Sequence, residues 1–67
     1  MSIERLILRS GSFCITIDTR DFMSVSEGFQ QVNHAHVFGD ISAYERGVFI
    51  GYLINYYNSL TRQFKAS

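Results

Sequence analysis

Apolar and polar residues alternate in the first part of the chain. Residues 13–19 alternate, with apolar side chains at 13, 15 and 17, which is the pattern of a strand with one buried face. The apolar set is Phe13, Ile15 and Ile17, and the intervening residues are Cys14, Thr16 and Asp18. Residues 3–9 are also apolar and branched, and Ser10-Gly11-Ser12 is a turn signal because glycine readily adopts a positive φ. The pattern predicts a β-hairpin around a three-residue turn.

The spacing of apolar residues then changes to that of a helix. Four of them recur at intervals of three or four residues, namely Phe22, Val25, Phe29 and Val32. They predict a short helix over about residues 25–34. Ser24 followed by Glu27 matches a capping box, which places Ser24 at the helix N-cap. Gly28 lies inside this helix, where glycine costs about 1 kcal/mol relative to alanine.

A longer helix is predicted in the second half of the chain. Ser42 and Glu45 form another capping box, and helical spacing continues from there, which predicts a helix over residues 42–64. Its apolar side consists of Phe49, Leu53, Tyr56, Tyr57, Leu60 and Phe64, with Ile50 and Ile54 beside them. Between the two helices, residues 35–38 fit either a short third strand or a simple connection.

These elements predict a small α+β domain with the order ββα(β)α. The apolar face of the hairpin is expected to pack on the long C-terminal helix. Because a two-stranded sheet is marginal in isolation, we expect one of two additions. Either residues 35–38 supply a third strand, or a free edge of the hairpin pairs with another chain.

Length and cysteine content favour a domain that depends on a partner. The 67 residues suffice for one domain, residues 1–67. A chain of this size buries only about 60% of its unfolded surface, so small domains often rely on disulfides, a metal or a partner. Cys14 is the only cysteine, which excludes an internal disulfide and fits a reducing compartment. We therefore expect a cytoplasmic protein that binds another protein or a second copy of itself.

Charge and hydropathy argue against two classes of partner, nucleic acids and membranes. Six basic and six acidic residues give a net charge of zero, which argues against a dedicated nucleic-acid-binding protein. The apolar residues 6–8 are bracketed by Arg5 and Arg9, so no signal peptide is expected. The longest apolar run, residues 48–54, is far shorter than the roughly 20 residues that span a bilayer, and no membrane contact is expected.

The residues that could support catalysis or metal binding are few. His34 and His36 would face the same way on a strand, as metal ligands do, but a closed zinc site needs four ligands and no second pair is present. Cys14 lies in a predicted strand, where a cysteine is more typical of a small packed hydrophobe than of a nucleophile. We predict no enzymatic activity, no metal, no cofactor and no small-molecule substrate.

The side of the long helix opposite its apolar stripe is the candidate contact face. The residues predicted to contact a partner are Tyr44, Gly47, Gly51, Tyr52, Asn55, Asn58 and Arg62. Two glycines four residues apart cost a helix about 2 kcal/mol relative to alanine, and they allow another backbone to approach closely. Tyrosine is a frequent interface anchor, and Tyr44 and Tyr52 are expected to be exposed. Two alternatives remain open: a plain solvent-exposed face, or glycines that fit against the protein's own hairpin.

These observations favour a small non-enzymatic regulator or inhibitor that binds a protein. Chains of this size and style are common among phage and mobile-element genes, and by analogy we expect a target in a host defence complex, as for anti-CRISPR proteins, in the host cytoplasm. The first alternative is a dimeric nucleic-acid-binding protein that uses Arg5, Arg9, Arg20, Arg46, Arg62 and Lys65. The second is a structural subunit of a homo-oligomer.

Overall fold

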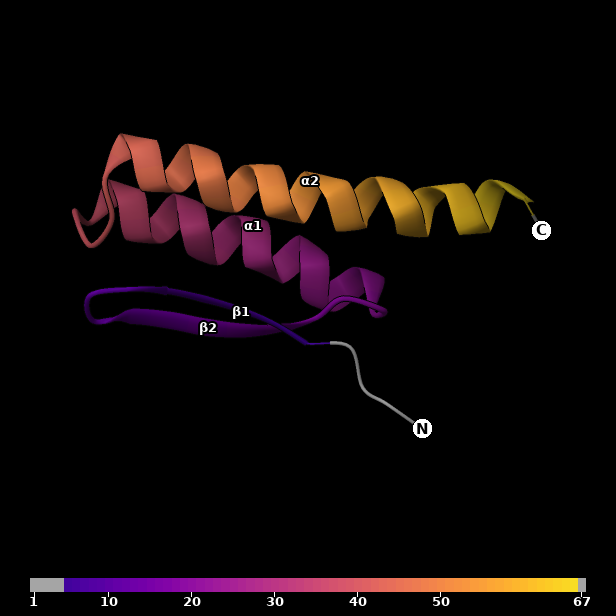
Figure 1. Ribbon diagram of the computed structural model, residues 1–67, viewed down its shortest axis with the longest axis horizontal. Coiled ribbons are helices and arrows are strands. Elements are labelled where there is room, and N and C mark those ends of the chain that lie inside the picture. The colour runs from indigo at the N-terminus through magenta and orange to yellow at the C-terminus, as the bar shows by residue number, and fades with distance from the viewer. Residues whose placement is uncertain (1–4, 67) are drawn as a thin grey trace.

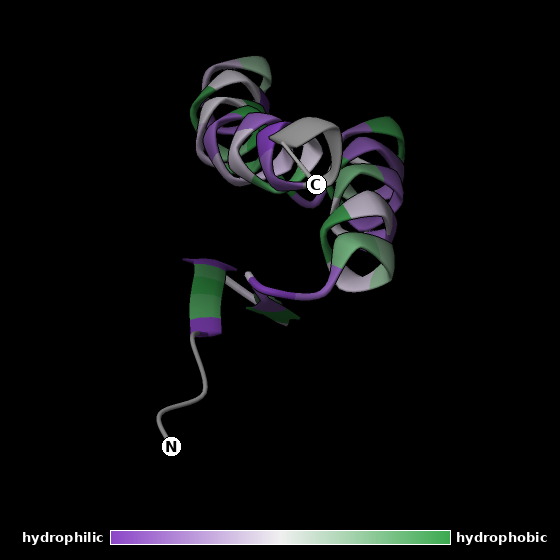
Figure 2. Cartoon of the chain, turned by 90° about the vertical axis from the view of Figure 1, so that its right-hand side faces the viewer, coloured by the Kyte–Doolittle hydropathy of each residue, from purple (hydrophilic) through white to green (hydrophobic). Residues whose placement is uncertain are grey.

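The computed structural model describes residues 5–66, with side chains described for residues 5–63. Two strands are followed by two helices: β1 (Arg5–Ser10), β2 (Phe13–Asp18), α1 (Phe22–Val37) and α2 (Ala43–Ala66). The helices lie side by side on the same side of the hairpin, and α2 extends past the beginning of α1 (Figures 1 and 2). The predicted α+β architecture is therefore confirmed. Residues 3 and 4 of the first predicted strand lie outside the described residues.

The hairpin has the predicted alternation and a tighter turn than predicted. The strands pair antiparallel, and Ser10 opposite Phe13 closes the turn, so the turn consists of Gly11 and Ser12 instead of three residues. Gly11 has φ +58°, which glycine adopts without the strain that a side chain would add. Ile17 is buried, whereas Cys14 on the opposite face is exposed. The prediction of Cys14 as a packed hydrophobe is wrong, because its position in the alternation directs it away from the helices.

Helix α1 begins earlier than the predicted residue 25. Asp21 is the N-cap, and its side chain accepts a hydrogen bond from the Met23 N–H at 3.1 Å. The capping box that was predicted for Ser24 and Glu27 is wrong, because the hydroxyl of Ser24 serves another group. It accepts a hydrogen bond from the backbone N–H of Asp18 at 2.9 Å and so joins α1 to the end of β2.

Helix α1 also ends later than predicted, and the possible third strand is absent from the described residues. Residues 35–37 continue the helix, Phe38 is its C-cap, and Gly39 with φ +83° turns the chain away. The reason is burial: Ala35 extends the buried side that includes Val25 and Val32, so the helix gains by continuing through this segment.

The second predicted capping box is confirmed at the beginning of α2. The Glu45 N–H donates to the Ser42 hydroxyl at 3.1 Å, and the Ser42 N–H donates to the Glu45 carboxylate at 2.9 Å. Leu53 on the predicted stripe is completely buried. Tyr56 is half-buried against the core. Phe64, the last residue of the predicted stripe, lies outside the described side chains.

The core lies where both helices meet the inner face of the hairpin. Its buried members are Leu8, Ile17, Val25, Val32, Ala35, Ile41, Phe49, Leu53 and Leu60. Phe13 of β2 stacks on Phe49 of α2 with ring centroids 6.0 Å apart, while Ile17 packs on α1 at Gly28. The expectation that the hairpin packs on the long helix alone is therefore too narrow, because α1 covers β2 as well.

Aromatic side chains close the contact between the two helices. The ring of Tyr57 lies 5.1 Å from that of Phe22 and 5.9 Å from that of Phe29, measured between centroids. At its other end the pair of helices is joined by Arg46, whose Nε donates to Oδ1 of Asn33 at 2.9 Å. With α1 on one flank of α2 and the hairpin on another, the remaining surface of α2 faces outward.

Candidate functional site

The seven residues predicted to contact a partner all lie on the outward surface of α2. We call this set the α2 outer face: Tyr44, Gly47, Gly51, Tyr52, Asn55, Asn58 and Arg62. All seven are exposed, and for Tyr44 and Tyr52 this confirms the predicted exposure. Tyr44 is 82% exposed and Tyr52 is 52% exposed, so both hydroxyls are available for contact. The geometry follows from α2 itself, because Leu53 and its stripe point inward and leave the opposite side to solvent.

Open space surrounds the two glycines of this face. A Cβ atom built on Gly47 or Gly51 would meet no neighbouring atom of the described residues within 4 Å. The alternative in which these glycines fit against the hairpin is therefore wrong. The close approach occurs at Gly28 instead, where a Cβ would lie 2.7 Å from Cδ1 of Ile17 and 3.1 Å from Cδ2 of Leu53. The sequence did carry this signal, because Gly28 lies on the same side of α1 as Val25 and Val32.

Two apolar residues that were not predicted as contacts border the α2 outer face. Val48 is 37% exposed and Ile54 is 45% exposed. Helix α2 has no charged residue between Arg46 and Arg62. The surface between these two arginines therefore offers aromatic, aliphatic and amide groups without charge. Arg46 at one end of it is hydrogen-bonded to Asn33 of α1. Such a composition suits the centre of a protein interface, where charged residues are depleted.

Glu45 fixes the position of this surface relative to the hairpin. Its carboxylate accepts hydrogen bonds from the Ser10 hydroxyl at the end of β1 and from the Ser42 N–H at the N-cap. These hydrogen bonds, from Ser10 first and then from Ser42, lower the pKa of Glu45 below its ordinary value of 4.5. The carboxylate therefore ties the hairpin turn to the beginning of α2.

The structure separates the groups that sequence analysis weighed as metal ligands. His34 and His36 lie on α1 instead of on a strand, and residues two apart on a helix point to nearly opposite sides. The ring of His34 lies against that of Phe38, with centroids 6.2 Å apart. Among residues with described placement, no three His, Cys, Asp or Glu side chains come together as a metal site would require.

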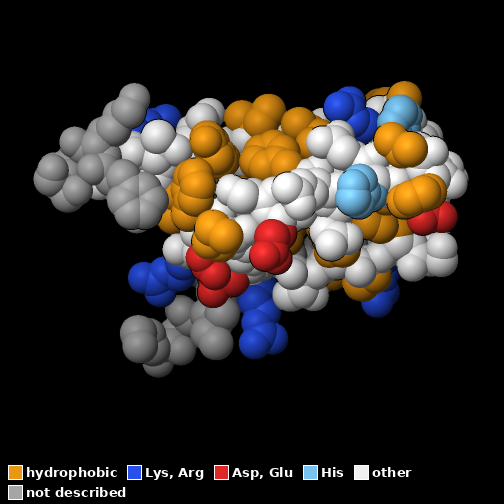
Figure 3. Space-filling view, turned by 180° about the vertical axis from the view of Figure 1, so that it is seen from behind, with side chains coloured by type: hydrophobic (Ala, Val, Ile, Leu, Met, Phe, Trp, Pro, Cys, Tyr) orange, Lys and Arg blue, Asp and Glu red, His pale blue; other side chains and the backbone are white. Residues whose placement is uncertain are grey.

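The described arginine side chains lie at separate places on the face seen in Figure 3 and do not gather into a patch there. No helix in the described part of the chain is long and apolar enough to cross a membrane. Comparisons with protein-family models, curated proteins and solved structures find no match for this chain.

Proposed function

We propose that this protein is a small, non-enzymatic binding module that regulates or inhibits another protein through the α2 outer face. One observation carries the proposal: Tyr44 and Tyr52 stand exposed beside Gly47 and Gly51, whose surroundings are open. A partner that approaches this surface finds two amphipathic anchors, the rings of Tyr44 and Tyr52. Beside them is a recess where Gly47 and Gly51 carry no side chain, and the side chains of the partner would fit there. The amides of Asn55 and Asn58 offer donors and acceptors at the edge of that recess.

The proposal includes the class of target. A regulator encoded by a phage or mobile element, directed at a host defence complex, is the expected biological setting, by analogy of size and style. The partner could also be a second copy of the chain. The identity of the bound protein distinguishes these cases, and mass measurement in dilute solution identifies self-association.

The test uses the full chain as bait in an extract of its native host. Gly51→Leu fills the recess, whereas Gly51→Ala, the matched control, leaves most of it open. We expect the parent and Gly51→Ala to retain one specific protein or to self-associate, and Gly51→Leu to lose that contact. Both variants should melt at or above the temperature of the parent, because alanine and leucine favour helix over glycine by about 1 kcal/mol.

Two results would contradict the proposal. One is a Gly51→Leu variant that binds the same protein with the same affinity as the parent. The other is a Tyr52→Ala variant that also binds unchanged, since the exposed ring is expected to be an anchor. A dimeric nucleic-acid-binding protein is not favoured, because the net charge is zero and the arginines on the face seen in Figure 3 do not gather into a patch.

A further inference from the structure

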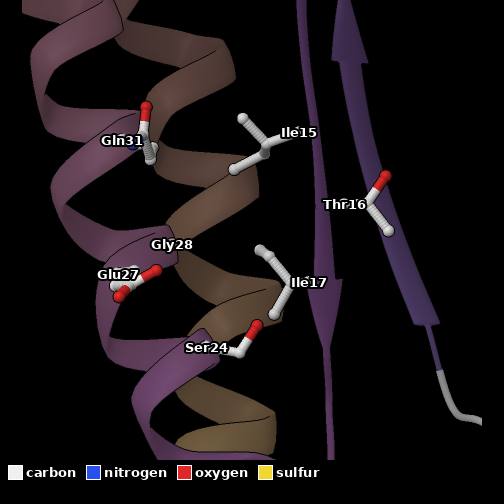
Figure 4. Close-up of a pocket in the computed structure, with 7 residues that line it drawn as sticks. All are labelled: Ile15, Thr16, Ile17, Ser24, Glu27, Gly28 and Gln31. Atoms are coloured by element: carbon white, nitrogen blue, oxygen red, sulfur yellow. The ribbon is translucent and has the colours of Figure 1, made fainter.

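A shallow groove separates β2 from α1, away from the α2 outer face (Figure 4). Its volume is about 270 Å³. Residues 15–17 line it from the strand, and Ser24, Glu27 and Gln31 line it from the helix. In Figure 4, Ile15 and Ile17 point toward α1, while Thr16 points the other way. The groove thus lies between α1 and the edge of β2 that does not pair with β1. We call this edge the free edge of β2.

The hydrogen bonds of Asp18 reveal which backbone groups point into this groove. The Asp18 N–H donates to the Ser24 hydroxyl at 2.9 Å, and its carbonyl accepts from the Asp21 N–H at 3.1 Å. Both groups of Asp18 therefore point away from β1. Since strand residues alternate, the N–H and C=O groups of Thr16 and Cys14 point away from β1 as well. No hydrogen bond to these outward groups is found within residues 5–63.

The two edges of the hairpin differ in their protection. Proteins commonly guard free strand edges with charged side chains. β1 carries two exposed arginines, Arg5 and Arg9, whereas β2 has no charged residue from Phe13 to Ile17. The unguarded edge is the one beside the groove. The N–H of Asp18 already donates to the hydroxyl of Ser24, so a strand that paired with this edge could extend only as far as residue 17.

We propose that the free edge of β2 binds an extended segment of a partner protein as an added antiparallel strand, with basic side chains facing α1. The backbone of such a segment would pair with the outward groups of Cys14 and Thr16. Glu27 is the charged residue among the described residues that line the groove, so a lysine or arginine at an inward position complements it. This site is separate from the α2 outer face and goes beyond the proposed function.

Other occupants fit less well. The groove is smaller than the roughly 300–1,000 Å³ of typical small-molecule sites. A second copy joined edge to edge by a two-fold axis would bring its own α1 to the same face of the joined sheet, where the first α1 already flanks the edge. An extended segment brings no helix. It also supplies the third strand that a marginal two-stranded sheet lacks and that residues 35–38 do not provide.

The probe is a blocked peptide, Val-Lys-Val-Lys-Val, titrated into the isotope-labelled full chain. Valines opposite Cys14 and Thr16 would face outward, and lysines would face Glu27. We expect saturable shifts of the amide resonances of Cys14 and Thr16. The charge-reversed peptide Val-Glu-Val-Glu-Val should bind at least about tenfold more weakly, because its carboxylates would face that of Glu27.

A matched pair of variants isolates the edge. Thr16→Pro removes an outward N–H of β2, whereas Ile7→Pro removes the outward N–H of its cross-strand partner at the other edge. Neither change removes a hydrogen bond between β1 and β2. Thr16→Pro should weaken peptide binding at least about tenfold, while Ile7→Pro should leave it within about twofold of the parent.

Should Thr16→Pro fail to fold, a probe peptide methylated at its valine nitrogens decides the question with the parent protein. It should bind at least about tenfold more weakly than the unmethylated peptide, since it cannot donate to β2. Three results would overturn the proposal: no binding of the lysine peptide to the parent, equal binding of the methylated peptide, or a parent dimer that Thr16→Pro dissociates.

Discussion

Gly28 and Gly51 both lie inside helices, but their surroundings differ. The Cα of Gly28 stands directly against Ile17 of the hairpin, whereas that of Gly51 faces open space. Glycine at position 28 suits the packing, because a Cβ there would force the side-chain ends of Ile17 and Leu53 to shift within the core. At position 51 no internal contact requires glycine, and the residue only lowers the stability of the helix.

The substitution Gly28→Ala should therefore destabilise the protein by about 1–3 kcal/mol, as overpacking of a core does. Gly51→Ala, the control with the same chemical change, should stabilise it by up to about 1 kcal/mol. Urea denaturation of both variants measures the difference. Equal effects at the two positions would show that Gly28 is not the point of closest approach between the layers.

The pKa of Glu45 makes the stability of the protein depend on pH. Because its pKa is lowered in the folded state, the contribution of this carboxylate is present above the ordinary value of 4.5 and is lost as pH falls through the folded pKa. We expect the urea midpoint of the parent to decrease between about pH 5 and about pH 3, and that of Glu45→Gln to decrease less. Parallel curves for the two proteins would contradict this assignment.

At the scale of elements, local sequence signals predict the hairpin and α2 well. Alternation and Gly11 define the hairpin, and the reciprocal bonds of Ser42 and Glu45 define where α2 begins. The limits of α1 could not be predicted in the same way. The hydroxyl of Ser24 is used by Asp18, which is a contact between elements, and residues 35–37 are held in the helix by burial of Ala35. Tertiary packing overrides local preference at both ends.

The same distinction holds for the two proposed binding surfaces. Exposure of Tyr44 and Tyr52 could be predicted from helical periodicity, because Tyr44 lies opposite the apolar stripe and Tyr52 lies at its edge. The groove beside β2 could not be predicted, because it exists only where Gly28 lets α1 approach the strand. A surface that belongs to one helix can be predicted from the helical periodicity of its sequence. A surface between two elements depends on how those elements pack.

Leu53 is the residue through which α2 contributes most to the core. It is completely buried and contacts the region of Gly28. Leu53→Ala should cost about 2–5 kcal/mol. That loss is comparable with the whole stability of a small domain, which is about 0.05–0.15 kcal/mol per residue. Thermal melting followed by circular dichroism measures it.

The neighbouring Ile54 provides the control for this substitution. Because it is 45% exposed, Ile54→Ala removes fewer buried contacts and should lower the melting temperature much less. If the two variants melt together, Leu53 does not occupy the centre of the core.

At the scale of the whole molecule, the hairpin, α1 and α2 share one hydrophobic core, and we predict that its stability does not depend on a metal. Treatment with a chelator should leave the melting temperature within about one degree of the untreated protein, because the described acidic, histidine and cysteine side chains do not converge. The control is a sample to which zinc is restored. A loss of several degrees that zinc reverses would show that His34 or His36 takes part in a metal site.

The order of the elements has a consequence for the speed of folding. β1 pairs with β2, α1 packs on α2, and β2 packs on α1, so the most extensive contacts join elements that follow one another in the chain. The contacts of Ser10 with Glu45 and of Phe13 with Phe49 are of longer range. Such mainly local topology closes mostly short loops, and proteins of this kind fold on a timescale of about microseconds to milliseconds. Two hairpins, one of strands and one of helices, can each form before they meet.

We expect the slowest event in folding to be the docking of the strand hairpin on the helix hairpin at Gly28. Gly28→Ala should slow folding as well as reduce stability, whereas Ile54→Ala should change the folding rate little. Temperature-jump relaxation of the two variants measures this directly. If Gly28→Ala speeds unfolding and leaves the folding rate unchanged, the two hairpins dock only after the rate-limiting barrier.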